Sequence, residues 1–193
     1  MSSPSQSPPP RLFTFAAGAT GTWTVTLTRP VIGESLPDAA ALSVVAAGPA
    51  VEVGETAAAW RLRGIVSNER YVERAEKDAL VARQEGLGRA ACTRAALIPI
   101  RKSAAWWALT QDERRDVFEA QSRHIAIGMR YLPAIARRLH HCRDLGPDEP
   151  FDFLTWFEFA PEDAGAFEDL VGQLRASPEW RFIDREVDVR LSR

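Results

Sequence analysis

The sequence predicts an α+β fold in which helices pack against antiparallel sheets. Two patterns carry this prediction. Residues 183–191 (IDREVDVRL) alternate apolar and polar positions, which indicates a strand with two different faces. Thr110 and Glu113 form a T-x-x-E capping box, the usual start of a helix. Strands and helices are therefore both expected in the second half of the chain.

The remaining elements of that half follow from alternation and from proline positions. The helix that begins at Thr110 must end near Leu132, because Pro133 follows it. Pro161 opens a second helix, which carries an apolar side made of Ala164, Phe167, Leu170, Val171 and Leu174. Further strands are expected over 94–102, 135–142 and 151–159. The order strand, helix, strand, strand, helix, strand predicts a ferredoxin-like unit.

The first half predicts a shorter version of the same unit. Residues 1–10 (MSSPSQSPPP) indicate a disordered tail, because prolines and serines offer nothing to bury. Two strands are expected within 13–30, around Gly18 and Gly21, and others at 41–46 and 60–66. A helix is expected within 69–88, ended by glycines. We expect one domain over 11–193, divided into halves 11–97 and 98–193.

Composition narrows the classes of function. The net charge of −2 gives no electrostatic case for binding nucleic acid or an anionic membrane. Two cysteines are too few for a disulfide framework or a cysteine zinc site. No run approaches the roughly 18 apolar residues of a membrane span, and the polar N-terminus does not resemble a secretory signal. We expect a soluble, cytoplasmic protein.

His124 and Arg137 are the two side chains that most need an explanation. A regular helix places His124 on one stripe with Val117, Ala120, Gly128 and Tyr131, and the glycine leaves room for a flat group. A hydrogen-bonded core histidine is the alternative. Arg137 shares a strand face with Ile135 and Leu139, so its charge points inward and needs a carboxylate or an anionic ligand. The sequence leaves both alternatives open.

Other polar and aromatic residues carry weaker signals. His140, His141 and Cys142 are adjacent in a predicted strand, so alternation sends them to opposite faces and they fit one metal site poorly. Indole and ammonium donors suit the carboxylates of a large planar cofactor, although paired tryptophans are often core or interface residues. The candidates for such donors are Asn68, Tyr71, Lys102, Trp106 and Trp107.

Several stretches together resemble the chlorite dismutase family, in particular its short, dimeric branch: SNERY, ALIPIRKSAAWWALTQDERR, HIAIGMRYLPAIARRLHHCRDLG, FDFLTWFEFAPEDAGAFEDLV and LRASPEWRFIDREVDVRL. The resemblance implies two ferredoxin-like halves, the first one trimmed, whose antiparallel sheets form a β-barrel surrounded by helices. It also implies a homodimer with one haem b per chain, held by the second half.

The resemblance assigns roles residue by residue. His124 corresponds to the proximal iron ligand, and Glu179 to the carboxylate that hydrogen-bonds that histidine. Arg137 corresponds to the catalytic arginine on the substrate side. Asn68, Tyr71, Lys102, Trp106 and Trp107 fall at positions that contact haem or its propionates, whereas Val117, Leu132 and Phe157 fall at apolar positions of the haem pocket.

The implied activity is the conversion of chlorite to chloride and dioxygen, with O–O bond formation. In that scheme Arg137 keeps a hypochlorite-level fragment near the iron until it recombines. Two alternatives remain. Coproheme decarboxylases share the fold, but they typically lack this arginine and have a longer first half. A haem-binding dimer without chlorite turnover is the other alternative.

Overall fold

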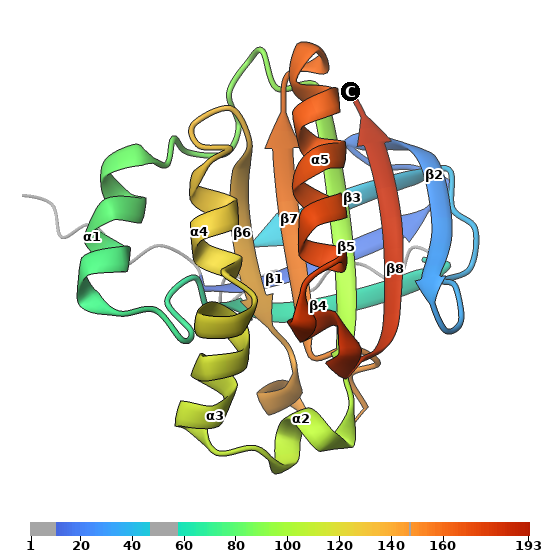
Figure 1. Ribbon diagram of the computed structural model, residues 1–193. Helices are drawn as coiled ribbons and strands as arrows, with labels where there is room; N and C mark the ends of the chain where they lie inside the picture. Colours follow the sequence, from blue (N-terminus) through green and yellow to red (C-terminus); the bar gives the residue numbers. More distant parts are fainter. Residues whose placement is uncertain (1–10, 47–57, 147) are drawn as a thin grey trace, which may run out of the picture.

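The computed structural model describes residues 11–46, 58–146 and 148–193, so the predicted N-terminal tail lies outside the described residues. Within those ranges, eight antiparallel strands close into a barrel in the order β1-β3-β2-β8-β5-β7-β6-β4 (Figure 1). The strands are β1 (Leu12–Gly18), β2 (Trp23–Ile32), β3 (Ala41–Ala46), β4 (Trp60–Val66), β5 (Arg94–Lys102), β6 (Ala136–His141), β7 (Phe153–Phe159) and β8 (Ile183–Ser192).

The barrel consists of two sheets with the same strand order. The first half runs β4-β1-β3-β2 and the second runs β8-β5-β7-β6, so each half has the order 4-1-3-2 when its strands are numbered along the chain. This confirms the predicted pair of ferredoxin-like halves. In the first half, only residues 19–22 connect β1 to β2. In the second half, the equivalent connection from β5 to β6 contains helical segments. The predicted boundary at residues 97–98 falls inside β5.

Two seams join the halves. The β2–β8 seam is long, with Cα partners running from Thr24↔Ser192 to Ile32↔Glu186. The β4–β6 seam pairs only Ile65↔His141 and Val66↔His140. The N-terminal part of β6, which contains Arg137, therefore lacks a neighbouring strand on its β4 side.

The barrel interior is the main hydrophobic core. Phe15, Leu42, Leu97 and Trp156 are almost fully buried there. His140 also points inside, with its ring centroid 5.0 Å from that of Phe15. Burial lowers the pKa of His140 to about 4, even though the carbonyl of Leu154 opposes that shift by hydrogen bonding. This histidine is therefore neutral and belongs to the core.

Helices cover the outer face of the second sheet (Figure 1). Helix α5 (Ala164–Arg175) buries Phe167, Leu170, Val171 and Leu174 against that face, which confirms four of the five residues predicted for its apolar side. The other helical segments are α1 (Arg74–Arg83), α2 (Ala104–Ala108), α3 (Gln111–Arg115), η1 (Asp116–Gln121), α4 (His124–Met129), η2 (Arg143–Leu145), η3 (Pro161–Asp163) and η4 (Pro178–Phe182).

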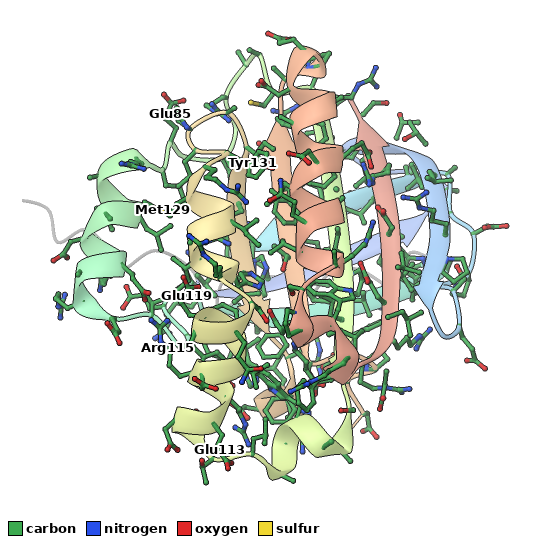
Figure 2. The ribbon with its side chains drawn as sticks, in the orientation of Figure 1. Glu85, Glu113, Arg115, Glu119, Met129 and Tyr131 are labelled. Atoms are coloured by element: carbon green, nitrogen blue, oxygen red, sulfur yellow. The ribbon has the colours of Figure 1, made fainter. Side chains whose placement is uncertain are left out.

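The single helix predicted over 110–132 is wrong, because the chain breaks it into α3, a π-helical turn η1 and α4. The capping box of Thr110 and Glu113 does form. Arg123 then adopts a left-handed conformation with φ of 54°. The carboxylate of Glu119 accepts hydrogen bonds from the backbone N–H of Ile125 (2.6 Å) and of Ala126, so it caps the new helix start (Figure 2).

The helix predicted within 69–88 is shorter than expected. Helix α1 begins after Glu73, which forms a capping box with Glu76. Tyr71, inside the predicted range, has a φ of 62° and cannot belong to a regular helix. None of the described helices is long and apolar enough to cross a membrane.

Candidate active site

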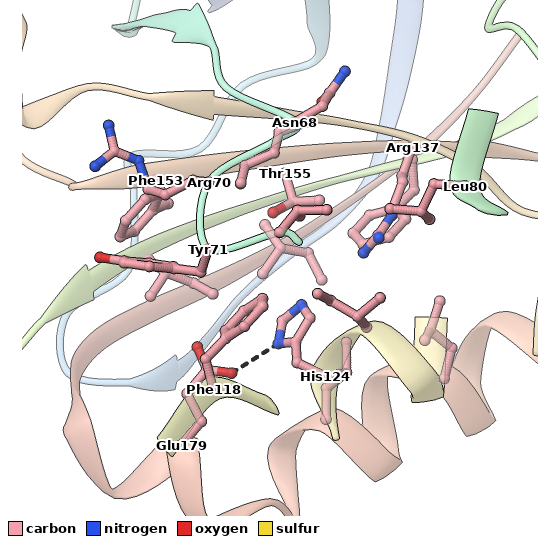
Figure 3. A pocket seen from close by; sticks show the side chains of 18 of the residues that line it. Asn68, Arg70, Tyr71, Leu80, Phe118, His124, Arg137, Phe153, Thr155 and Glu179 are labelled. Atoms are coloured by element: carbon pink, nitrogen blue, oxygen red, sulfur yellow. Dashed lines mark hydrogen bonds and ion pairs between the residues drawn. The ribbon is translucent and has the colours of Figure 1, made fainter. Parts of the chain in front are cut away.

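A cavity of about 380 Å³ lies between the outer face of the second sheet and the helices around it. Its walls come from the loop before α1, from strands β5, β6, β7 and β8, and from segments α1, α2, η1, α4, α5 and η4. His124 at the start of α4 and Arg137 on β6 both line it, and Figure 3 shows their side chains facing the same space. The volume is typical of a site for a small molecule or cofactor.

His124 is held by a buried carboxylate. Its Nδ1 lies 2.7 Å from Oε2 of Glu179, a contact drawn in Figure 3. The ring of Phe118 stacks on the imidazole at a centroid distance of 4.3 Å. Among the described residues, none hydrogen-bonds the other ring nitrogen, Nε2. The imidazole is thus fixed on one side and open on the other, as a metal-binding histidine is.

Glu179 is ionised and fully engaged. Its Oε1 lies 2.5 Å from Nζ of the buried Lys102, and its backbone N–H donates to Oγ of Ser122 over 2.8 Å. Burial alone would raise the pKa of Glu179, but the charge of Lys102 and the hydrogen bonds from His124 and Lys102 outweigh it and lower the pKa to about 2. A carboxylate in this state accepts the Nδ1 proton, which leaves the lone pair of His124 on Nε2.

Arg137 carries a charge for which the described part of the chain supplies no carboxylate. Burial lowers the pKa of its guanidinium, which nevertheless stays protonated at working pH. Within residues 11–46, 58–146 and 148–193, this guanidinium makes no hydrogen bond or ion pair. It packs over Gly128 instead, where a Cβ atom would lie 3.1 Å from Nη1. The structural ion pair considered for Arg137 is absent from the described residues, so an anionic ligand is the better explanation.

The backbone around Arg137 is held by side chains where β4 no longer pairs with it. Nε2 of Gln84 donates to the carbonyl of Arg137 over 3.0 Å, and the N–H of Leu139 donates to Oδ1 of Asn68 over 2.8 Å. Asn68 lines the cavity, but this amide oxygen serves β6 instead of a ligand. Gln84 was not singled out from the sequence, because nothing in the order of residues links it to β6.

Two buried donors in the cavity wall lack partners. The hydroxyl of Tyr71 and Nε1 of Trp106 are both inaccessible and without a hydrogen bond among the described residues, and their rings meet edge to face at 6.0 Å. Buried donors of this kind normally have an acceptor. The binding of a planar cofactor's carboxylates by Tyr71 and Trp106 stays a prediction, for which these two donors are free in the described part of the chain.

Lys102 and Trp107 both bond to acidic side chains of the protein itself. Lys102 lines the cavity, but its ammonium pairs with Glu179 and lies 4.2 Å from the ring centroid of Trp106. Trp107 lies outside the cavity lining, where its Nε1 donates to Oδ2 of Asp152 and its ring stacks on Phe153. Lys102 thus supports the histidine side of the site through Glu179.

Of the three apolar positions expected in the pocket, Phe157 lines the cavity, whereas Val117 and Leu132 do not. The expectation for Val117 assumed a regular helix. The π-helical turn η1 changes which side chains face the sheet, so Phe118 forms the wall beside His124. Leu132 follows the end of α4 and lies in a separate surface depression beside residues 82–85.

Comparisons of the sequence and the fold with known proteins all point to one protein family. The family described as chlorite dismutase matches residues 53–193. A crystal structure of the dimeric chlorite dismutases from Nitrobacter winogradskyi is 58% identical in sequence, with a TM-score of 0.84. The similarity covers 94% of this chain and 99% of that one.

Two more distant similarities are also to proteins named chlorite dismutase. A variant of chlorite dismutase from Candidatus Nitrospira defluvii is 27% identical with a TM-score of 0.57, over 70% of this chain and 55% of that one. Chlorite dismutase from Ideonella dechloratans is 34% identical over 86 residues. That match spans 45% of this chain but only 27% of the relative's length.

Proposed function

This chain belongs to the chlorite dismutase family, and on that premise we propose that it binds one haem b through His124 and converts chlorite to chloride and dioxygen. One observation carries the proposal. A single cavity is lined both by an imidazole backed by an ionised carboxylate and by an arginine without a counter-ion among the described residues. The imidazole is suited to bind iron, and the arginine is suited to bind an anionic substrate.

The residues of the cavity fit a haem. Nε2 of His124 is the iron ligand, and Glu179 holds the proton at Nδ1, which strengthens the donation from Nε2. The unpartnered donors of Tyr71 and Trp106 bind propionate oxygens. Phe118 and Phe157 supply apolar wall that keeps water from the reaction space. Haem, when bound, supplies the redox-active iron on which chlorite is cleaved and the O–O bond is made.

Arg137 acts on the anions. Chlorite and hypochlorite each carry one negative charge, and a guanidinium offers fixed donors at any working pH. The neighbouring strand face is apolar, so an anion beside Arg137 is poorly screened by water and is held more strongly. Holding the two fragments of one chlorite together makes their recombination effectively unimolecular. The arginine therefore governs the yield of dioxygen more than it governs cofactor binding.

We also expect a homodimer. The Nitrobacter structure that covers 94% of this chain is described as dimeric. No helix lies between β1 and β2 in the part of the first half that the structure describes, and an uncovered apolar face favours self-association. Leu27 on β2 is 42% exposed, and among the described residues Val81 is the other exposed large apolar side chain. Light scattering of the purified protein tests this, and a monomer or a pentamer would contradict it.

The test of the activity is direct. The protein is reconstituted with haem b and given chlorite, while an electrode follows dioxygen, with free haem as the control. We expect dioxygen and chloride in equal amounts, one of each per chlorite consumed. A stable haem complex that evolves no more dioxygen than free haem would favour the non-catalytic haem-binding alternative. The decarboxylase alternative predicts loss of carboxyl groups from coproheme, and Arg137 argues against it.

A further inference from the structure

The short 3-10 turn η4 presents two consecutive side chains to two different partners. Glu179 contacts His124 and Lys102, as described above. Trp180, the next residue, donates its indole N–H to Oε2 of Glu186 on β8 over 2.7 Å. Two successive residues of one tight turn are thus bonded at once to the histidine and to the sheet.

Glu186 is an unusual residue to find at this place. It is 0% exposed, on the outer face of β8, and lines the cavity beside Trp180. Its other oxygen, Oε1, accepts a hydrogen bond from Nε of Arg175 over 2.8 Å. Arg175 also lies 3.0 Å from Asp188, the next outward-facing residue of β8. A buried carboxylate is tolerated only when it is paired, and here both oxygens have a donor.

Backbone bonds hold the ends of η4 and the N–H of Glu179 bonds to Oγ of Ser122, whereas the indole of Trp180 supplies a side-chain bond from η4 to β8. The N–H of Ser177 donates to Leu174 and the N–H of Ser103 donates to Phe182, which fixes where the turn begins and ends. Among the side chains of Pro178–Phe182, in the part of the chain that the structure describes, only that of Trp180 bonds to β8. Loss of this bond would remove the side-chain tie between η4 and β8, so the position of the turn would depend on its end bonds and on the bond of Glu179 to Ser122.

We propose that Glu186 is a positioning residue for the iron-binding histidine, which acts through Trp180 by locking the turn that presents Glu179 to Nδ1 of His124. This inference rests on the proposed function as far as haem is concerned. Its mechanical part, the coupling of the indole bond to the position of Glu179, does not need haem. A purely structural role, in which the network only docks α5 on β8, is the competing explanation.

The test replaces the indole donor and keeps an aromatic ring. In haem-free Trp180→Phe, amide hydrogen exchange at Glu179 should accelerate about fivefold, the factor expected when one ordinary hydrogen bond is lost. Trp60→Phe is the matched control, because Nε1 of Trp60 also donates one bond, to the carbonyl of Pro37 over 3.0 Å, far from η4 in the sequence. The control should leave exchange at Glu179 unchanged.

The haem-loaded protein gives the second measurement, the ferric/ferrous reduction potential. Trp180→Phe should raise the reduction potential, as Glu179→Ala should, but by a smaller amount. In the double variant Trp180→Phe/Glu179→Ala, the tryptophan change should add nothing, because its effect passes through Glu179. Glu186→Gln should give a smaller shift of the same sign, since an amide satisfies only one of the two donors.

Three results would overturn the inference. One is unchanged exchange at Glu179 in haem-free Trp180→Phe. Another is a potential shift that adds fully to that of Glu179→Ala. The third is an equal effect of Trp60→Phe. If the protein fails to bind haem, the exchange measurement still decides the mechanical part, so failure of the proposed function and failure of this inference remain distinct.

Discussion

The guanidinium of Arg137 packs directly over Gly128, the residue one helical turn after His124. A Cβ atom at position 128 would lie 3.1 Å from Nη1 and 3.4 Å from Cζ of the arginine. The sequence indicated that this glycine leaves room for a flat group. The structure shows that the flat group in contact is the arginine, so the position of the substrate-side charge depends on the helix that carries the proposed iron ligand.

Gly128→Ala should change catalysis without loss of stability. Alanine is the better helix former by about 1 kcal/mol, and the contact it creates is with the far end of a flexible side chain. Arg137 must then shift by a few tenths of an ångström. We expect an unfolding midpoint equal to or above that of the parent, with a lower dioxygen yield per haem. A lowered midpoint with an unchanged yield would contradict this relationship.

His124→Ala should abolish stable haem binding, because it removes the nitrogen that faces the cavity. His140→Ala and His141→Ala are the controls. His140 lies inside the barrel between Phe13 and Phe15. His141 packs against Phe153, which lines the cavity, but His141 itself does not belong to the lining. Titration with haem, followed by absorbance, checks all three variants. Loss of haem in a control variant, with retention in His124→Ala, would refute the assignment.

Glu179→Ala should raise the ferric/ferrous potential, because the ligand histidine loses the acceptor that strengthens its donation. Glu158→Ala is the control. Glu158 is also buried, but it accepts from Trp156 and from the N–H of Gly88 and lies outside the cavity lining. Spectroelectrochemistry should show a rise in the first variant and none in the second. An unchanged or lowered potential in Glu179→Ala would count against the contact.

Asp188 should contribute stability that is lost in acid. Burial would raise the pKa of this carboxyl, but hydrogen bonds and charges from Arg190, Arg175 and Arg29 lower it from 3.8 to about 2. A lowered pKa stabilises the fold above pH 3.8, and the effect disappears as the pH falls towards 2. It amounts to about 2 kcal/mol. Urea unfolding from pH 6 to pH 2 should show a weaker acid dependence in Asp188→Asn, and equal slopes would contradict this.

Most strands could be predicted from the sequence because their signals are local, whereas the closed barrel was implied by the family resemblance. Alternation marks β8, and the apolar side of α5 follows from its helical spacing. The break at Arg123 could not be predicted in this way. Arg123 adopts a positive φ although it is not a glycine, and the cap of α4 comes from Glu119, five residues before the helix begins.

Part of the candidate site could also be predicted from local sequence signals. Arg137 lies on a regular strand, and His124 and Gly128 lie on one regular helical turn, so their faces could be inferred. The pocket position of Phe157 came from the family resemblance. Lys102 and Glu179 are 77 residues apart, and no local pattern shows that they pair. Asn68 clamps β6 because β4 stops pairing with it, a property of the barrel seam. Such roles depend on which segments meet in space, which one sequence does not show.

The central claim is that Arg137 holds the anionic fragment of chlorite until dioxygen forms. Arg137→Ala tests it, with Arg138→Ala as the matched control, since Arg138 points into the barrel over the ring of Phe13. The decisive measurement is dioxygen yield per haem, with and without methionine as a hypochlorite scavenger. We predict that Arg137→Ala keeps its haem, loses less in initial rate than in total turnovers, and is partly protected by methionine. A yield and lifetime equal to those of the parent would contradict the account.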